Sequence, residues 1–288
     1  MKLSEQLKNE RPMLSFEVFP PKTEARFEPI MVAVEGIAKL DPAYMSVTYG
    51  AGGGTSQYTV EIAKRIKAMN VTPLAHLTCV SSDEATVRTQ LTALKAAGIE
   101  NILALRGDLP EDYVPGPYRH ASELIDEIHR FSPDFCIGGA CYPEGHPESA
   151  RQKDDIRHLK EKVDRGCEFL TTQMFFDNDL FYNFMYKIRQ AGINVPIVAG
   201  IMPVTNAAQI SRIVDLSGAF MPQSFLNIVD HFRDDPASIY EAGIAYATEQ
   251  IVDLFANGID HVHVYSMNKP DVAAAIQNNL KGILGKTK

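Results

Sequence analysis

The sequence has 288 residues, 45% of them apolar, which is long for one compact domain but normal for an α/β barrel. Its formal net charge of −8 argues against a nucleic-acid groove and against an anionic membrane surface. The N-terminus MKLSEQLKNERPM lacks the apolar core of a signal peptide, and no apolar segment is long enough to span a bilayer, so we expect a cytoplasmic protein.

Short β-rich runs alternate with longer segments of helical period along the chain. Such repeated βα units imply parallel strands with right-handed crossovers, and this number of units fits a closed barrel better than an open sheet. The expected strands are 13–19, 43–49, 72–78, 100–106, 135–142, 169–176, 196–202 and 260–266.

Helical segments lie between these strands. Residues 152–165 place Ile156, Leu159 and Val163 on one face, and the segments KAAGIEN, VDRGCEF, RQAGINV and FANGIDH each place a glycine between a helix and a strand, as a C-cap would. Residues 217–235 look like an additional loop and short helix. We therefore predict a single (β/α)8 TIM barrel over residues 1–288.

Polar residues recur where the expected strands end. In a (β/α)8 barrel the carboxyl ends of the strands and the loops that follow them form the ligand site. Residues of this kind are Glu17, Thr48, Tyr49, His76, Arg106, Asp108, Tyr142, Glu144, His146 and Gln173. The sequence therefore predicts a mixed polar site at this end of the barrel.

Arg106 and Asp108 follow a buried run in NILALRGDLP, and two interpretations stand beside each other. The two side chains satisfy one another, or they hold a ligand between them. Glu17 has a similar ambiguity, because a carboxylate in an apolar strand either pairs with a cation of a neighbouring strand or, in a dry barrel mouth, has a raised pKa suited to a general acid.

Other chemistries have weaker support. The glycine run GAGGGT lacks the spacing of a dinucleotide motif and indicates a turn. Two sets of residues have side chains of the kind that bind metals: His76, Tyr142 and His146 with Glu17 or Asp108, and the pair His261 and His263. Hydrogen bonding is the favoured role of these histidines, and we expect no metal. The four cysteines are expected to be buried free thiols, and no nucleophile motif indicates covalent catalysis.

Seven ordered motifs, SFEVFPPKT, SVTYGAGG, AHLTC, LALRGDLP, YPEGHPE, TTQMFFD and GIMPV, together resemble the methylenetetrahydrofolate reductase family. The resemblance covers about residues 13 to 270. It implies an FAD-bearing barrel with ping-pong kinetics, in which NADH or NADPH first reduces the flavin and methylenetetrahydrofolate is then reduced to methyltetrahydrofolate in the same place. This reaction belongs to one-carbon metabolism and methionine biosynthesis.

The resemblance also implies roles for individual residues. Glu17 matches the acid that protonates N10 of the folate, and Asp108 matches the carboxylate between flavin and pterin. Gln173 matches a residue that contacts folate and nicotinamide in turn, while Gln209 and Lys269 match folate contacts. The positions that match FAD contacts are Thr48, Tyr49, Ala51, His76, Arg106, Gly107, Asp108, Ala121, Tyr142, His146, Asp155, His158 and Lys162.

Four positions depart from the family's pattern. His158 and Glu161 stand where members often carry Asn and Arg on the FAD-binding helix. Ile213 stands where an aromatic residue can stack on folate, and Lys269 where an Arg can meet the folate tail. Glu17, Asp108 and Gln173, which match the chemical centre, follow the pattern.

Two other functions remain open at the level of the sequence. A proline dehydrogenase-like flavin barrel would share the cofactor, but methylenetetrahydrofolate would not reoxidise its flavin. A non-catalytic barrel subunit of a larger reductase complex would be colourless. We expect a homo-oligomer that binds small molecules and neither nucleic acid nor a membrane, while the choice between NADH and NADPH stays open because no Rossmann unit is present to read.

Overall fold

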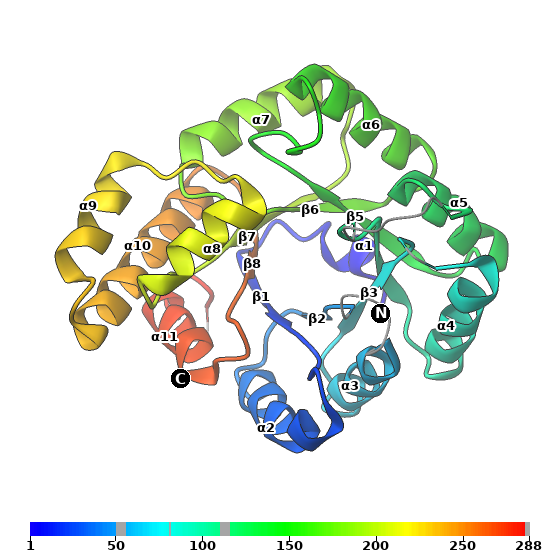
Figure 1. The fold of residues 1–288 in the computed structure, drawn as a ribbon, viewed down its shortest axis with the longest axis horizontal. Helices are drawn as coiled ribbons and strands as arrows, with labels where there is room; N and C mark the ends of the chain where they lie inside the picture. Colours follow the sequence, from blue (N-terminus) through cyan, green and yellow to red (C-terminus); the bar gives the residue numbers. More distant parts are fainter. Residues whose placement is uncertain (50–55, 81, 110–115, 286–288) are drawn as a thin grey trace.

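The computed structural model describes residues 1–49, 56–80, 82–109 and 116–285. Eight parallel strands form a closed barrel in sequence order, with the last strand paired to the first (Figure 1). The strands are β1 (Met13–Val18), β2 (Met45–Val47), β3 (Pro73–Thr78), β4 (Asn101–Leu105), β5 (Cys136–Cys141), β6 (Phe169–Thr172), β7 (Ile197–Ile201) and β8 (His261–Val264). The predicted (β/α)8 barrel is confirmed.

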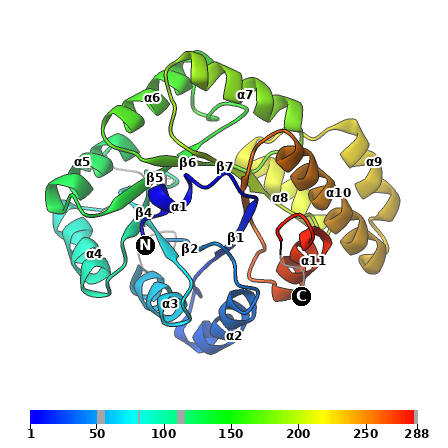
Figure 2. The same ribbon diagram turned by 180° about the vertical axis from the view of Figure 1, so that it is seen from behind.

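Helices surround the strands as an outer ring (Figure 1). They are the 3-10 helix η1 (Glu24–Arg26) and α2 (Phe27–Ala38), α3 (Ser56–Ala68), α4 (Glu84–Ala96), α5 (Ala121–Phe131), α6 (Gln152–Asp164), α7 (Asn178–Gln190), α8 (Ala208–Ser217), α9 (Gln223–Phe232), α10 (Pro236–Ala256) and α11 (Pro270–Leu280). The short helix α1 (Leu3–Gln6) lies inside the ring instead, near β4 and β5, as Figure 2 shows from behind.

Each predicted strand contains one observed strand, and the observed strands are shorter by one to four residues because residues at one or both ends lie outside the ladder. The expected helix at 152–165 is α6, and the additional segment at 217–235 contains α9. The four glycines that were read as helix C-caps, Gly98, Gly166, Gly192 and Gly258, all have positive φ, between 66° and 103°. The left-handed conformation that ends these helices is therefore the reason for glycine at these positions.

The amino-terminal end of the barrel is filled with apolar side chains. Leu3 and Leu7 from the α1 region pack against Leu74, Leu103 and Phe169 of the strands, in one buried cluster. Burial of side chains of this size stabilises a fold by about 1.5–3 kcal/mol each. Since α1 supplies part of this layer, it closes the barrel at this end.

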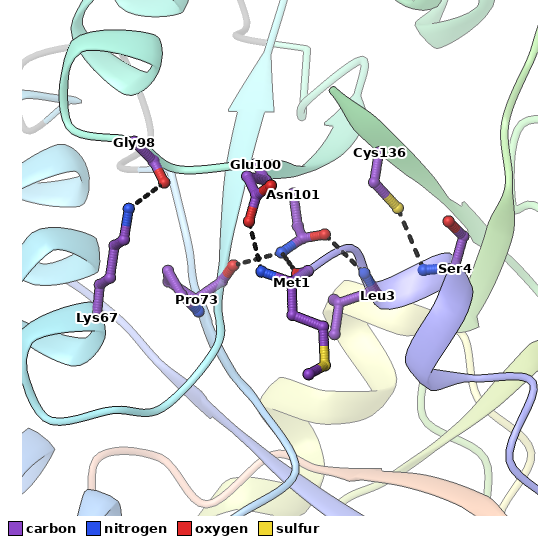
Figure 3. Close-up of polar contacts among 9 residues, drawn as sticks. All are labelled: Met1, Leu3, Ser4, Lys67, Pro73, Gly98, Glu100, Asn101 and Cys136. Atoms are coloured by element: carbon purple, nitrogen blue, oxygen red, sulfur yellow. Dashed lines mark hydrogen bonds and ion pairs between the residues drawn. The ribbon is translucent and has the colours of Figure 1, made fainter. Parts of the chain in front are cut away.

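Asn101 fixes α1 to the barrel with hydrogen bonds (Figure 3). Its side-chain oxygen accepts from the Leu3 N–H at 2.8 Å, and its amide nitrogen donates to the carbonyls of Met1 at 3.1 Å and Pro73 at 3.2 Å. The terminal ammonium group of Met1 also pairs with Glu100. A buried amide whose hydrogen bonds are made in this way holds the first residues of the chain in place.

Three further observations bear on the sequence-based expectations. All four cysteines are free and buried, as expected. Among the described residues, none of the helices is both long and apolar enough to cross a bilayer. Residues 50–55, which hold the glycine run and Ala51, lie outside the described residues, so the turn expected there is not tested.

Candidate functional site

An outer cavity of about 330 Å³ lies at the carboxyl ends of β4 and β5, beside α5 and α6. Most of the residues that match FAD contacts line it together, although they come from separate parts of the chain. The lining residues are Ala104, Leu105, Arg106, Gly107, Asp108, His120, Ala121, Ser122, Ala140, Tyr142, His146, Glu148, Ser149, Asp155, His158, Glu161 and Lys162.

Gly107 shapes the rim of this cavity. Its φ is +90°, and a Cβ at this position would lie 2.6 Å from a methyl group of Val80. A side chain is therefore excluded both by the backbone conformation and by the neighbour. The turn directs the chain out of β4, so that Arg106 is largely buried while Asp108 is exposed.

The guanidinium of Arg106 pairs with Glu148, so the simple Arg106–Asp108 pair is not the arrangement found. Nη1 and Nη2 donate to the two carboxylate oxygens of Glu148 at 2.6 and 2.7 Å, and Nε donates to the Gly107 carbonyl at 3.1 Å. The hydrogen bond to Arg106 lowers the pKa of Glu148. Such a bidentate pair is among the stronger polar contacts a protein makes.

Lys162 is a second cation at the outer cavity. Its Nζ donates to the Ala140 carbonyl at 2.7 Å, which anchors α6 to β5. Nearby, burial raises the pKa of Asp155 and lowers the pKa of His146, so both groups favour their neutral forms more than in water. The ring of Tyr142 meets the ring of His146 edge to face, with centroids 4.6 Å apart.

A second, inner cavity of about 220 Å³ lies above the barrel interior. Its lining comes from strands around the barrel and consists of Glu17, Leu74, His76, Leu103, Leu105, Ala140, Tyr142, Thr171, Thr172, Gln173, Met174, Met202, His263 and Tyr265. Leu105, Ala140 and Tyr142 line both cavities, so the two adjoin.

Glu17 is the carboxyl group of the inner cavity. Burial raises its pKa to about 8, as expected for a carboxyl in a dry barrel mouth. His76 Nε2 lies 3.8 Å from a Glu17 oxygen, and burial lowers the pKa of His76 to about 3, so the imidazole is neutral. The described residues that line this cavity include neither Lys nor Arg to stabilise the ionised form of Glu17, so Glu17 can carry a proton near neutral pH.

Buried polar groups of the inner cavity differ in whether they have partners. Within the described residues, His76 Nε2 and Thr171 Oγ1 are buried without a hydrogen-bond partner. Tyr265 donates to the Thr172 carbonyl at 2.6 Å, and the Gln173 side chain accepts from the Met174 N–H at 3.0 Å. Unpartnered buried polar atoms in a cavity wall fit a site that receives polar atoms from a ligand.

Several residues matched to the family's contacts line neither cavity. Thr48 and Tyr49 follow β2, and the Thr48 carbonyl accepts from Thr59 at 3.0 Å. Gln209 and Lys269 come together at Thr205, because Gln209 Oε1 accepts from the Thr205 N–H and Lys269 Nζ donates to Thr205 Oγ1, both at 3.1 Å.

Ile213, the position of a possible aromatic stack, is a buried member of the apolar cluster that contains Phe176, Met202 and Phe225. It therefore packs into the layer around α8 and α9.

Sequence reasoning missed other residues of the cavity walls. Glu148 lies two residues beyond His146 in the quoted motif YPEGHPE, so its position was visible although its role was not. His120 precedes Ala121 and stacks on His158 with ring centroids 6.3 Å apart. The other lining residues without a site role in the sequence analysis are Leu74, Leu103, Ala104, Leu105, Ser122, Ala140, Ser149, Thr171, Thr172, Met174, Met202 and Tyr265.

The histidine pair on β8 makes hydrogen bonds, which agrees with the favoured interpretation. His263 contacts Ser15 Oγ at 2.7 Å and Ser46 Oγ at 2.9 Å, and His261 contacts the Leu7 carbonyl at 2.8 Å. The described residues contain no group of three or more His, Cys, Asp or Glu side chains that could hold a metal ion.

The closed barrel defines an α/β-barrel protein, and its two adjoining cavities lie at the carboxyl ends of the strands, where enzymes of this fold carry their ligand sites. The family model described as methylenetetrahydrofolate reductase matches residues 2–281. The chain belongs to the methylenetetrahydrofolate reductase family.

Individual relatives agree with this assignment. The chain is 34% identical to 5,10-methylenetetrahydrofolate reductase of Escherichia coli over 271 residues, which cover 93% of this chain and 90% of the relative. It is also 34% identical to methylenetetrahydrofolate reductase (NADH) 1 of Arabidopsis thaliana over 290 residues, or 95% of this chain and 49% of the relative. The chain thus spans about half the length of the plant and yeast relatives it matches.

Solved structures share the fold. One is an uncharacterized protein from Clostridium thermocellum that binds two copies of 5-methyl-5,6,7,8-tetrahydrofolic acid, with a TM-score of 0.67, 16% identity and coverage of 100% of both chains. At this identity the likeness supports the barrel fold alone.

Proposed function

We propose that this chain is a flavin-dependent methylenetetrahydrofolate reductase, which uses NADH or NADPH and produces methyltetrahydrofolate by a ping-pong mechanism. The observation that carries the proposal is the inner cavity, where Glu17 has a pKa raised to about 8 and lies beside a neutral His76. Opening the ring that bridges N5 and N10 of the folate needs a proton at N10. A carboxyl that stays protonated near neutral pH can supply it.

The outer cavity suits FAD in its donors and its walls. Arg106 and Lys162 provide cations for a pyrophosphate, while Ala121, Ala140 and Leu105 provide apolar surface. The unpartnered Nε2 of His76 adds a polar atom in the adjoining inner cavity. When bound, FAD supplies the redox chemistry, because it accepts a hydride from the nicotinamide and passes a hydride to the folate.

The residues of the chain have distinct tasks in this proposal. Arg106, Lys162 and the walls of the outer cavity hold the cofactor. Glu17 delivers a proton to N10, and Asp108 at the rim accepts a hydrogen bond from the pterin. The other matched FAD contacts that line the cavities hold and orient the cofactor; they are His76, Gly107, Ala121, Tyr142, His146, Asp155 and His158.

Gln173, in the wall of the inner cavity, is the contact that nicotinamide and folate use in turn. Gln209 and Lys269 bind the folate beyond the cavities. Because one site serves both substrates, each must leave before the next binds, as ping-pong kinetics require.

The family relationship supports the substrate. A relative of this chain carries the name methylenetetrahydrofolate reductase (NADH), and a protein with the same fold binds 5-methyl-5,6,7,8-tetrahydrofolic acid. We propose that this chain likewise uses a nicotinamide cofactor and binds a folate, in one-carbon metabolism. The proposal also includes one catalytic domain over residues 1–288, a homo-oligomeric state and a cytoplasmic location.

A visible spectrum of the purified protein tests the function directly. We expect flavin absorption bands that bleach when NADH or NADPH is added without oxygen and return when methylenetetrahydrofolate is added. A colourless protein that takes up no FAD would contradict the cofactor. Bleaching without recovery on addition of the folate would favour a flavin barrel with another substrate, such as a proline dehydrogenase-like enzyme.

A further inference from the structure

The outer cavity holds carboxylates beside the two cations that would face a pyrophosphate. The cavity wall contains more carboxylates than permanently charged cations; the carboxylates are Asp108, Glu148, Asp155 and Glu161, and the cations are Arg106 and Lys162. The proposed cofactor brings a pyrophosphate with further negative charge. Its binding therefore depends on how the existing carboxylates are arranged around the two cations.

Glu148 uses the side of Arg106 that an anion would use. One N–H on each of Nη1 and Nη2 donates to Glu148, and Nε donates to the Gly107 carbonyl. The planar fork of a guanidinium matches a carboxylate or a phosphate in the same bidentate way. A phosphate that made this contact would take the place of the Glu148 carboxylate.

The two partners differ in how readily they can move. The Arg106 side chain is 20% exposed and follows β4 directly, whereas the Glu148 side chain is 52% exposed and lies in the connection between β5 and α6. The Glu148 N–H donates to His146 Nδ1 at 3.1 Å, so the backbone of Glu148 is held while its side chain faces solvent. A rotation of this side chain into water would free Arg106 without moving a strand.

We propose that the Glu148 carboxylate binds the Arg106 guanidinium only while the cofactor is absent, and that the pyrophosphate of the cofactor displaces it. This exchange of anions at Arg106 sets the affinity of the outer cavity for the cofactor. The inference rests on the proposed function, because the cofactor is the ligand that completes the exchange. Glu148 is then a residue that determines affinity through Arg106.

Glu148→Gln tests the exchange, since glutamine keeps the size of the side chain and removes its charge. FAD is titrated into protein freed of bound nucleotide, and binding is followed by flavin fluorescence. We expect the variant to bind FAD roughly 3- to 10-fold more tightly than the wild type, because a partly exposed ion pair of good geometry no longer competes. Inorganic pyrophosphate, added without FAD, should also bind to this variant more tightly than to the wild type.

Glu161→Gln is the matched control. The Glu161 side chain is 49% exposed, lines the same cavity and pairs with His158 at 3.4 Å instead of with Arg106. It removes the same charge from the cavity wall without freeing Arg106, so its gain in affinity for FAD should be clearly smaller than that of Glu148→Gln if the exchange at Arg106 is the cause. In an Arg106→Ala background, the gain from Glu148→Gln should disappear, as a double-mutant cycle requires for coupled groups.

The outcomes separate this inference from the function on which it rests. If the wild type binds FAD and Glu148→Gln binds it equally or more weakly, Glu148 supports Arg106 and the exchange is wrong. An equal gain of FAD affinity in Glu161→Gln would mean that the total charge of the cavity causes the gain. That result would also overturn the proposed exchange at Arg106. If the wild type and all variants fail to bind FAD, the proposed cofactor is wrong, and the exchange with it.

Discussion

Asn101 and His76 are both buried polar residues of the barrel, but they lie toward opposite ends of it. Asn101, at the start of β4, makes hydrogen bonds to Leu3, Met1 and Pro73 (Figure 3). His76, near the carboxyl end of β3, has a buried Nε2 without a hydrogen-bond partner among the described residues, 3.8 Å from Glu17. The Asn101 amide thus has its hydrogen bonds made within the protein, whereas the His76 Nε2 atom can still form a hydrogen bond with a ligand.

This difference separates stability from function along one set of strands. A buried polar group that is satisfied by the protein stabilises the fold, whereas an unsatisfied one costs free energy unless a ligand completes it. In (β/α)8 barrels the carboxyl ends of the strands carry the active site and the amino ends carry stability. Changes at the two ends should therefore affect different measurements.

The largest effect is expected at the carboxyl end, in Glu17→Gln. Glutamine keeps the size of the side chain but cannot deliver an acidic proton to N10 of the folate. Reoxidation of the flavin by methylenetetrahydrofolate should slow by a factor on the order of 10²–10⁴. Reduction of the flavin by NADH needs no such proton and should stay near the wild-type rate. Anaerobic stopped-flow absorbance measures both steps on the same sample.

Glu144→Gln is the control for this variant. Glu144 follows β5, and burial raises its pKa as it raises that of Glu17. Unlike Glu17, Glu144 accepts a hydrogen bond from the Phe220 N–H at 2.7 Å and lines neither cavity. Both half-reactions should remain within a few-fold of wild type. Loss of both half-reactions in Glu17→Gln would indicate a structural role for Glu17, and folate reoxidation close to wild type would mean that another group is the acid.

Asn101→Ala tests the amino-terminal end. The substitution leaves the Leu3 N–H and the Pro73 carbonyl without their buried partner, so we expect a loss of about 2–4 kcal/mol in the free energy of unfolding. Urea denaturation measures this loss. Asn279→Ala, which removes a solvent-exposed hydrogen bond from α11 to Thr248, should change stability by less than about 1 kcal/mol. FAD binding by folded Asn101→Ala should equal that of the wild type, and a weakened affinity would contradict the separation of the two ends.

Lys162→Ala tests the outer cavity. If the ammonium opposes the pyrophosphate, the variant should bind FAD about 10-fold more weakly, as expected for the loss of one charge-assisted contact. Lys160, on the same helix, pairs with Asp164 and lines neither cavity, so Lys160→Ala serves as the control. Equilibrium titration with FAD compares the two variants. Equal affinity of Lys162→Ala and wild type would remove Lys162 from the cofactor site.

The fold could be predicted from the sequence because its signals are local. Each β-rich run and each glycine after a helix reports on its own neighbourhood, and repetition of the unit defines the barrel. The position of Glu17 at a strand exit left open whether it pairs with a cation or has a raised pKa, and its burial in the folded protein favours the raised pKa. By contrast, the partner of Arg106 is Glu148, 42 residues away, and only the packing of two loops brings them together.

The amino-terminal segment shows the same limit. MKLSEQLKNERPM reads as polar, yet Leu3 and Leu7 enter the apolar cluster inside the barrel. Their burial depends on Asn101, 98 residues from Leu3, which holds the segment in place. The hydrogen bonds of Gln209 and Lys269 to Thr205 also depend on the closed barrel. They require β7 and β8 to pair, although a long helical segment separates these strands in the sequence.

The last prediction concerns the pH dependence of stability, which changes gradually over several pH units. The pKa of Glu17 is raised to about 8 in the folded protein from 4.5 in a free side chain, so between these values the folded state binds more protons than the unfolded state. Stability from this group is present at low pH and is lost as pH rises toward 8, by at most about 1.4 kcal/mol per pH unit. Glu17→Gln removes this loss, because glutamine does not ionise. The free energy of unfolding of the variant should therefore rise relative to wild type between pH 5 and pH 8, and urea denaturation at several pH values measures the difference. A difference that is constant with pH would mean that Glu17 has an ordinary pKa in the folded protein. The inner cavity would then differ less from the amino-terminal end of the barrel, because Glu17 would not be an acid of raised pKa.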